Sequence, residues 1–154
     1  MTNEKTIEKM NAMKLFGMVR AFEQTMTENF QAEFTPDELL AHMVDAEWDD
    51  RKNRKLNRLL STARFRYISS FEGINFRVQR NLNKNTILRL SDCSWLQKGQ
   101  SLIITGSTGV GKSFLACALG NLACTNGYST LYFSSTKLFS QLKMANADGS
   151  YCKL

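Results

Sequence analysis

Apolar residues recur at helical spacing through the first sixty residues of the chain. Between residues 3 and 28 they define one face of a helical region: Ile7, Met10, Leu15, Met18, Phe22 and Met26. A further helix is predicted to begin at Thr35, which can cap it, with Pro36 in the first turn and Glu38 completing a capping box. Its apolar positions continue to Leu60, so this part of the chain is predicted to be all helical.

The second half of the chain alternates short apolar runs with helical patterns. Residues 102–105 form a β-branched apolar run typical of a buried strand, and residues 113–124 are mostly small or apolar, typical of a buried helix that ends near Asn126. A second strand is predicted at residues 129–134, and a further helix begins at residue 136. The order strand, helix, strand, helix is typical of a parallel sheet covered by helices.

The loop between the first strand and its helix carries a specific chemical motif. Residues 106–113 read GSTGVGKS and match the phosphate-binding (Walker A) pattern G-x-x-x-x-G-K-[ST] at every fixed position. Glycines let the backbone approach phosphates closely, and the backbone N–H groups then point at the anion. We therefore predict an ATP-binding site formed by Gly106, Ser107, Thr108, Gly109, Val110, Gly111, Lys112, Ser113 and Phe114.

Two residues of this phosphate loop have predicted roles of their own. Lys112 is predicted to reach the β- and γ-phosphates and is the catalytic candidate, while the Ser113 hydroxyl is predicted to bind Mg²⁺. The amino end of the following helix adds partial positive charge. ATP and Mg²⁺ are thus the expected cofactors, and the alternative is a glycine-rich turn that holds no ligand.

Composition restricts the class of protein. The 154 residues are 43% hydrophobic and 22% charged, which is typical of a globular protein. No apolar run approaches the ~18 residues of a membrane span, and the mixed charges of the amino terminus are unlike a signal peptide, so we expect a cytoplasmic protein without membrane contact. Cys117 and Cys124 share one face of the predicted helix and are expected to be buried thiols.

Charge is divided sharply along the chain. Residues 1–50 hold 4 basic and 11 acidic side chains, whereas residues 51–154 hold 16 basic and 3 acidic ones. The densest part is a basic segment at residues 51–66, with three aromatic residues within or just after it. It predicts non-specific contact with DNA phosphates through Arg51, Lys52, Arg54, Lys55, Arg58, Arg64 and Arg66. The alternative is a solvated helix face whose late basic residues suit the helix dipole.

Taken together, these residues resemble a known family. The stretch GSTGVGKSFLA at residues 106–116, the Asn-Gly-Tyr turn at 126–128 and Leu-Tyr-Phe at 131–133 are similar to the IstB-like ATP-binding proteins. These are helper ATPases of insertion-sequence transposition, related to the helicase loader DnaC within the AAA+ class. The resemblance covers the whole chain, including the lead-in at residues 71–76.

The resemblance implies a function and partners. ATP would bind at residues 106–113, and the amino-terminal helices would engage DNA or partner proteins. ATP-bound subunits of full-length members would assemble into homo-oligomers on DNA and recruit or stimulate a transposase, or a replicative helicase in the loader branch. Tyr67 or Phe71 would lie near the adenine.

The sequence departs from the family pattern after the second strand. A hydrolysing member needs an apolar strand that ends in acidic (Walker B) residues, whereas the only acid after Asp92 is Asp148, in the turn-like stretch Asn-Ala-Asp-Gly. The resemblance therefore implies a member truncated at its carboxyl end, with hydrolysis lost or weakened. Whether the chain is an enzyme stays open.

We accordingly predict an α/β fold with two domains. A small helical domain at residues 1–66 precedes the first part of an AAA+-like phosphate-loop domain at residues 67–154, whose parallel sheet is incomplete. An ATP-binding helper of transposition is the first functional hypothesis. The alternatives are a DnaC-like loader, a DNA- or protein-binding remnant without nucleotide function, and a product that does not fold stably.

Overall fold

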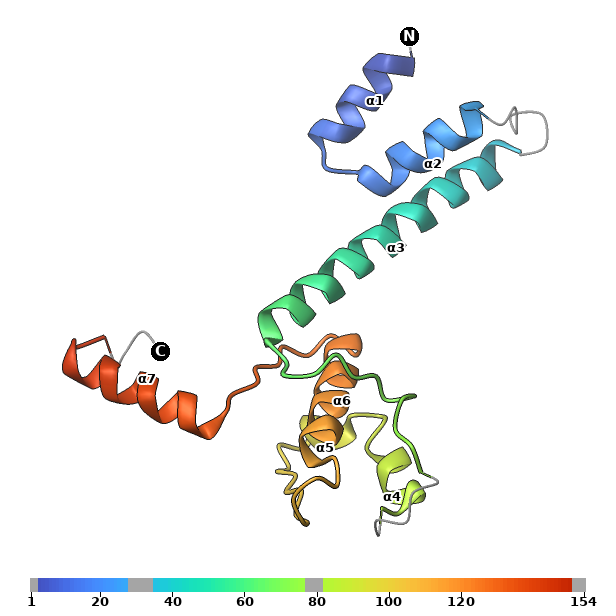
Figure 1. Ribbon diagram of the computed structural model, residues 1–154. Coiled ribbons are helices and arrows are strands. Elements are labelled where there is room, and N and C mark those ends of the chain that lie inside the picture. Colours follow the sequence, from blue (N-terminus) through green and yellow to red (C-terminus); the bar gives the residue numbers. More distant parts are fainter. Residues whose placement is uncertain (1–2, 28–34, 77–81, 151–154) are drawn as a thin grey trace. The chain divides into compact units, whose positions relative to one another are not determined.

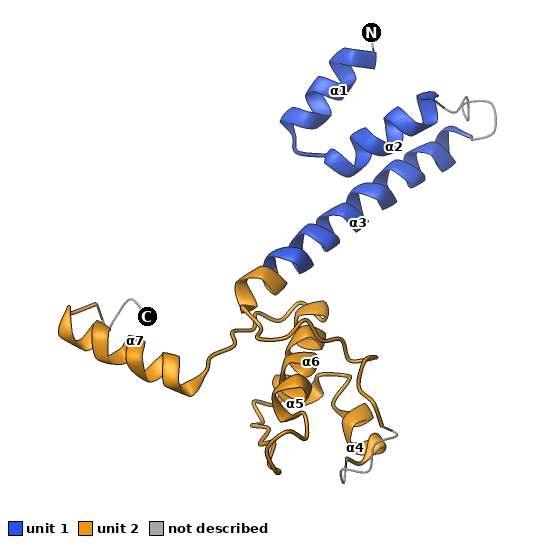
Figure 2. Ribbon diagram, in the orientation of Figure 1, with its two compact units in different colours: residues 1–58 blue, residues 59–154 orange. Residues whose placement is uncertain are grey.

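The computed structural model describes residues 3–27, 35–76 and 82–150. The chain divides into two compact units, unit 1 at residues 1–58 and unit 2 at residues 59–154 (Figure 2). This division falls earlier than the domain boundary that we predicted at residue 66. None of the helices in the described ranges is both long enough and apolar enough to cross a bilayer.

Three helices build unit 1, and the last of them runs on into unit 2 (Figure 1). They are α1 (Asn3–Ala12), α2 (Phe16–Thr27) and α3 (Pro36–Ala63). The helical region predicted over residues 3–28 is thus two helices, because the chain bends at Lys14, whose φ is +60°. A left-handed residue of this kind ends a helix.

The start of α3 confirms the predicted capping box. The Thr35 backbone N–H donates to Glu38 Oε2 at 2.8 Å, and the Glu38 N–H reaches the Thr35 hydroxyl at 3.4 Å. The Thr35 hydroxyl also donates to the same carboxylate at 2.9 Å. These bonds satisfy donors that the first turn leaves without helical partners.

Glu47 of α3 ties that helix to the amino end of α2. Its carboxylate is buried, and Oε2 accepts hydrogen bonds from the backbone N–H groups of Gly17 at 2.8 Å and Met18 at 3.4 Å. Oε1 accepts from Arg51 Nε at 2.6 Å. A carboxylate at a helix amino end complements both the unpaired N–H groups and the helix dipole, so one side chain joins two helices.

The two helices approach each other very closely at the same place. A Cβ atom built on Gly17 would lie 2.4 Å from the carbonyl oxygen of Ala46, which is closer than any side chain tolerates. Glycine is therefore required there, and it lets the Glu47 carboxylate reach the backbone of α2. One turn on, Arg20 pairs with Asp50 across the same interface.

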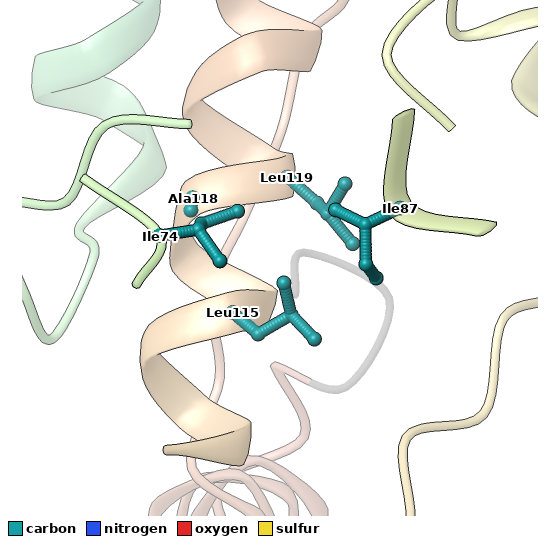
Figure 3. Close-up of a cluster of buried hydrophobic side chains, with 5 residues drawn as sticks. All are labelled: Ile74, Ile87, Leu115, Ala118 and Leu119. Carbon is teal, nitrogen blue, oxygen red and sulfur yellow. The ribbon is translucent and has the colours of Figure 1, made fainter. Parts of the chain in front are cut away.

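Unit 2 is organised around one buried helix. Its helices are α4 (Lys84–Arg89), α5 (Ser94–Gln97), α6 (Lys112–Thr125) and α7 (Ser135–Ala147). The buried side of α6 contributes Leu115, Ala118 and Leu119 to a core that Ile74 and Ile87 complete. Figure 3 shows Leu119 pointing toward Ile87 of α4, with Ile74 beside Ala118. The predicted helix and its end near Asn126 are confirmed.

The cysteines behave as the sequence predicts. Cys117 and Cys124 on α6 are buried free thiols, and Cys93 is buried as well. Burial, together with the charge of Asp92, raises the pKa of the Cys93 thiol despite a hydrogen bond from Asn126. Cys152 lies outside the described residues.

The described part of the chain is rich in helix and contains no strand, so the parallel sheet of the predicted α/β class stays a prediction. Residues 102–105 and 129–134 are irregular and form no ladder there. Ile103 is 83% exposed, so the run that we predicted to be buried is not buried, and Leu131 of the second run is 57% exposed. The two runs instead line an apolar groove of about 510 Å³ beside α6. A strand needs a hydrogen-bonded neighbour, and the two runs do not supply one to each other.

We expect Glu47→Ala to destabilise unit 1. The change leaves the N–H groups of Gly17 and Met18 without their acceptor, at a cost of about 1–3 kcal/mol in free energy of unfolding. Urea unfolding followed by circular dichroism measures it. The matched control is Asp49→Ala, on the exposed face of the same helix, which should change the free energy by less than about 0.5 kcal/mol. Equal effects of the two changes would contradict the role of Glu47.

The same carboxylate predicts how unit 1 responds to acid. Burial raises the pKa of Glu47, but the hydrogen bond from Arg51 and those from Gly17 and Met18 outweigh burial, and the net pKa lies below its ordinary value of 4.5. A lowered pKa stabilises the folded state above the unfolded-state value, and this stabilisation is lost as pH falls through the folded-state pKa. Stability should therefore fall below pH 4.5, and less steeply in Glu47→Gln. Parallel pH profiles would show that Glu47 does not carry this dependence.

Candidate nucleotide-binding site

The phosphate loop lies directly before the buried helix. Residues 106–110 are exposed, and α6 begins at Lys112 with Gly111 as its amino cap. All three motif glycines have positive φ angles, +148° at Gly106, +85° at Gly109 and +89° at Gly111. Only glycine adopts such angles without strain, so the spacing of glycines in the motif matches the backbone path.

Lys112 turns back onto the loop that precedes it. Its Nζ donates hydrogen bonds to the carbonyl oxygen of Gly106 at 2.8 Å and to that of Ser107 at 2.6 Å. The cation thus lies over the loop, where phosphates would approach backbone N–H groups. Ser113 is exposed in the first turn of the same helix, so its hydroxyl is open to a ligand.

A small hollow with a mixed polar and apolar lining adjoins the loop. It measures about 110 Å³, and its walls include Ile74, Leu82, Lys112 and Phe114. Phe114 also packs against the core of unit 2, so its ring fixes the helix as well as lining the hollow. Sequence reasoning missed Ile74 and Leu82, although the apolar lead-in at residues 71–76 pointed to this part of the chain.

Asp92 and Asp148, which precede and follow α6 in the sequence, lie in turns. Asp92 accepts a hydrogen bond from the Ser94 backbone at 3.0 Å, and Asp148 accepts from the Ser150 hydroxyl at 2.6 Å and its N–H at 2.9 Å. These bonds hold the pKa of each carboxyl below its ordinary value. The turn predicted at Asp148 is confirmed. No group of three potential metal ligands occurs among residues 3–27, 35–76 and 82–150.

The basic segment is divided between the two units. Arg51, Lys52, Arg54, Lys55 and Arg58 belong to unit 1, whereas Arg64 and Arg66 belong to unit 2. On α3, Arg51 and Arg54 pair with the acids one turn earlier. Arg51 Nε lies 2.6 Å from Glu47, and Arg54 Nε lies 2.6 Å from Asp50. Two of the seven predicted DNA contacts therefore form ion pairs within α3.

The aromatic residues of this region differ in exposure. The Phe65 ring lies against α6, where a Cβ on Gly120 would fall 2.6 Å from its Cε1 atom. Phe71 packs on the core of unit 2. Tyr67 is 41% exposed, and the Arg66 guanidinium lies over its ring at 5.3 Å. Tyr67 is thus the aromatic of the three that stays open to solvent.

Comparison with known proteins gives a consistent family. Residues 8–154 match the family described as IstB-like ATP binding protein. The chain is 36% identical, over 98% of its length, to a Pseudomonas fluorescens protein named for ATP binding in insertion sequence IS1162, and it spans 66% of that relative. It is also 36% identical, over 97% of its length, to an insertion-sequence ATP-binding protein of Sinorhizobium fredii, of which it spans 61%.

A more distant relative carries a similar name. An ATP-binding protein in an insertion sequence of Mycobacterium tuberculosis is 26% identical over 92% of the chain, which spans 57% of that protein. The chain therefore spans about six tenths of the length of the curated relatives it matches.

We expect Gly109→Ala to disturb the loop through backbone strain alone. A Cβ at Gly109 meets no atom within 4 Å, but its φ of +85° costs an L-residue about 1–2 kcal/mol. Chemical unfolding of the variant should show a loss of that order, or less if the loop relaxes. Gly73→Ala is the control, because its φ is ordinary and its new Cβ comes no closer than 3.4 Å to a neighbour. Equal losses would contradict a left-handed Gly109.

Proposed function

The chain belongs to the family of IstB-like ATP binding proteins, and on that premise we propose that it is an ATP-binding helper of insertion-sequence transposition. The observation that carries the proposal is the phosphate loop itself. Three glycines with positive φ are followed by Lys112 at the start of a buried helix. The names of its relatives, which refer to insertion sequences, support the biological setting.

The residues of the loop fit a nucleoside triphosphate with its divalent cation. The exposed backbone of residues 106–110 can turn N–H groups toward phosphates, and α6 adds the partial charge of its amino end. On binding, Lys112 would exchange the carbonyls of Gly106 and Ser107 for phosphate oxygens. Ser113 would supply a hydroxyl to Mg²⁺, whose charge offsets that of the phosphates. Ile74 and Leu82 would offer apolar contact beside them.

Turnover is proposed to be weak compared with binding. Hydrolysis needs a carboxylate that orients water and holds the metal. Within residues 82–150 the acids are Asp92 and Asp148, and both accept hydrogen bonds within their own turns. The proposed activity of this chain is therefore nucleotide-dependent binding, with hydrolysis a minor property.

The proposed role in insertion-sequence transposition implies which partners the protein has. We propose that the protein acts in the cytoplasm, engages DNA through its basic residues, and assembles with copies of itself and with a transposase in an ATP-dependent way. A DnaC-like helicase loader is the second candidate, with a replicative helicase as partner. The insertion-sequence names of the relatives favour the transposition role.

We expect saturable binding of a fluorescent ATP analogue by the 154-residue chain. Lys112→Ala removes the cation over the loop and should weaken binding at least tenfold. Ser113→Ala should reduce the gain in affinity that Mg²⁺ gives. Fluorescence anisotropy, with and without Mg²⁺, measures both effects.

The control is Lys98→Ala, an exposed lysine between α5 and the phosphate loop, which should bind the analogue like the parent chain. Circular dichroism should show that all variants keep their helices. A folded parent chain that does not bind the analogue would overturn the ATP-binding proposal. Equal binding by Lys112→Ala would assign the nucleotide to another site.

A further inference from the structure

A second, larger hollow in unit 2 gathers basic side chains from three segments. It measures about 610 Å³ and lies where the end of α3, the run at residues 129–134 and the first turns of α7 meet. Arg64, Arg66 and Lys137 contribute its cations, and Phe133, Ser134 and Gln141 contribute other parts of its wall. Lys137 is distant in sequence from the basic segment and was not among the predicted DNA contacts.

A backbone hydrogen bond brings these segments together. The N–H of Tyr132 donates to the carbonyl oxygen of Ala63 at 2.9 Å, and Ala63 is fully buried. Because that carbonyl is at the end of α3, the bond holds the helix end against the run that leads into α7 (Figure 1). Arg64 follows with a φ of +54°, which turns the chain at this point. A backbone hydrogen bond therefore holds together two of the segments that form the hollow and carry its side chains.

Within the part of the chain that the structure describes, these three cations have no acidic partner of the kind that Arg51 and Arg54 have on α3. Arg51 and Arg54 pair with Glu47 and Asp50. No ion pair to Arg64, Arg66 or Lys137 occurs among the described residues, and no carboxylate lines the hollow. Arg64, Arg66 and Lys137 are exposed, so a ligand can reach them. Like charges brought together at a surface create a positive potential that favours a polyanion.

The wall of the hollow also presents an aromatic ring. Phe133 is 50% exposed, and it lies between Tyr132 and Ser134 in the run that leads to α7. Cationic side chains beside an exposed aromatic ring are the features that bind a phosphodiester backbone and stack its bases. Nothing in this arrangement reads base edges, so the contact should depend little on sequence.

We propose that this hollow binds the phosphodiester backbone of DNA through Arg64, Arg66 and Lys137, with Phe133 as a stacking surface for an unpaired base. The inference rests on the DNA engagement proposed above and assigns it a site. Arg64 and Arg66 act there with Lys137, and the basic face of α3 is secondary. Duplex and single-stranded DNA both present phosphates to the three cations. Only single-stranded DNA presents an unpaired base that can stack on Phe133.

The test is salt-dependent binding of a labelled duplex and a labelled single strand by the full chain. Lys137→Gln should weaken binding about threefold or more at low salt, and it should lower the slope of log K against log salt by about 0.9 on the duplex and about 0.7 on the single strand. Arg64→Gln/Lys137→Gln should roughly double both effects. Phe133→Ala should weaken single-strand binding about fivefold or more and duplex binding less.

The matched control is Lys143→Gln, which removes the same charge from the same helix outside the hollow. It should leave the affinity and the slope near those of the parent chain. Lys52→Gln/Lys55→Gln tests the basic face of α3 in the same way. Circular dichroism should show unchanged helix content for every variant.

The outcomes separate the site from the function. If the α3 variant weakens binding while Lys137→Gln and Arg64→Gln/Lys137→Gln do not, DNA engagement stands and the hollow is overturned. If Lys143→Gln has the same effect as Lys137→Gln, the binding reflects net charge and the hollow is also overturned. If the parent chain binds the ATP analogue but no DNA, both the hollow and the proposed DNA engagement fall, and the nucleotide proposal remains.

Discussion

The burial of α6 is the interaction on which the rest of unit 2 depends. Leu115, Ala118 and Leu119 pack with Ile74 and Ile87, and each large aliphatic side chain removed from water contributes about 1.5–3 kcal/mol. The amino end of this helix fixes the phosphate loop. Further along, the absence of a side chain at Gly120 lets the Phe65 ring lie against the helix. One helix thus positions both the nucleotide site and the residues beside the cationic hollow.

Charge performs two different tasks in this chain. In unit 1 the acids of α3 hold neighbouring elements, because Glu47 binds the backbone of α2 and both Glu47 and Asp50 pair with arginines. Basic residues that follow them are therefore partly neutralised. In unit 2, Arg64, Arg66 and Lys137 gather at a hollow whose described lining contains no acidic side chain. A count of basic residues along the sequence does not distinguish paired from unpaired cations. The presence of an acidic residue four positions before a basic one, as on α3, does distinguish them.

The sequence predicts the local elements better than their assembly. The capping box at Thr35, the buried helix after the phosphate loop and the end of that helix near Asn126 all follow from rules that act over a few residues. The sheet could not be predicted by such local rules. A strand at residues 102–105 or 129–134 depends on a hydrogen-bonded neighbouring strand, and the spacing of residues along the sequence does not identify that neighbour. Lys137 was missed for a similar reason. Its nearness to Arg64 comes from a hydrogen bond between Tyr132 and Ala63, which are far apart in sequence.

Arg64 combines a strained backbone conformation with an exposed positive charge. Its left-handed conformation directly after α3 is the place where proteins prefer glycine, and an L-residue there gives up about 1 kcal/mol or more. A sequence optimised for thermal stability alone would carry glycine at this position, and stabilising substitutions are readily found where a protein is not at its optimum. A guanidinium at this turn means that selection or design toward higher melting temperature would act directly against the positive charge of the hollow.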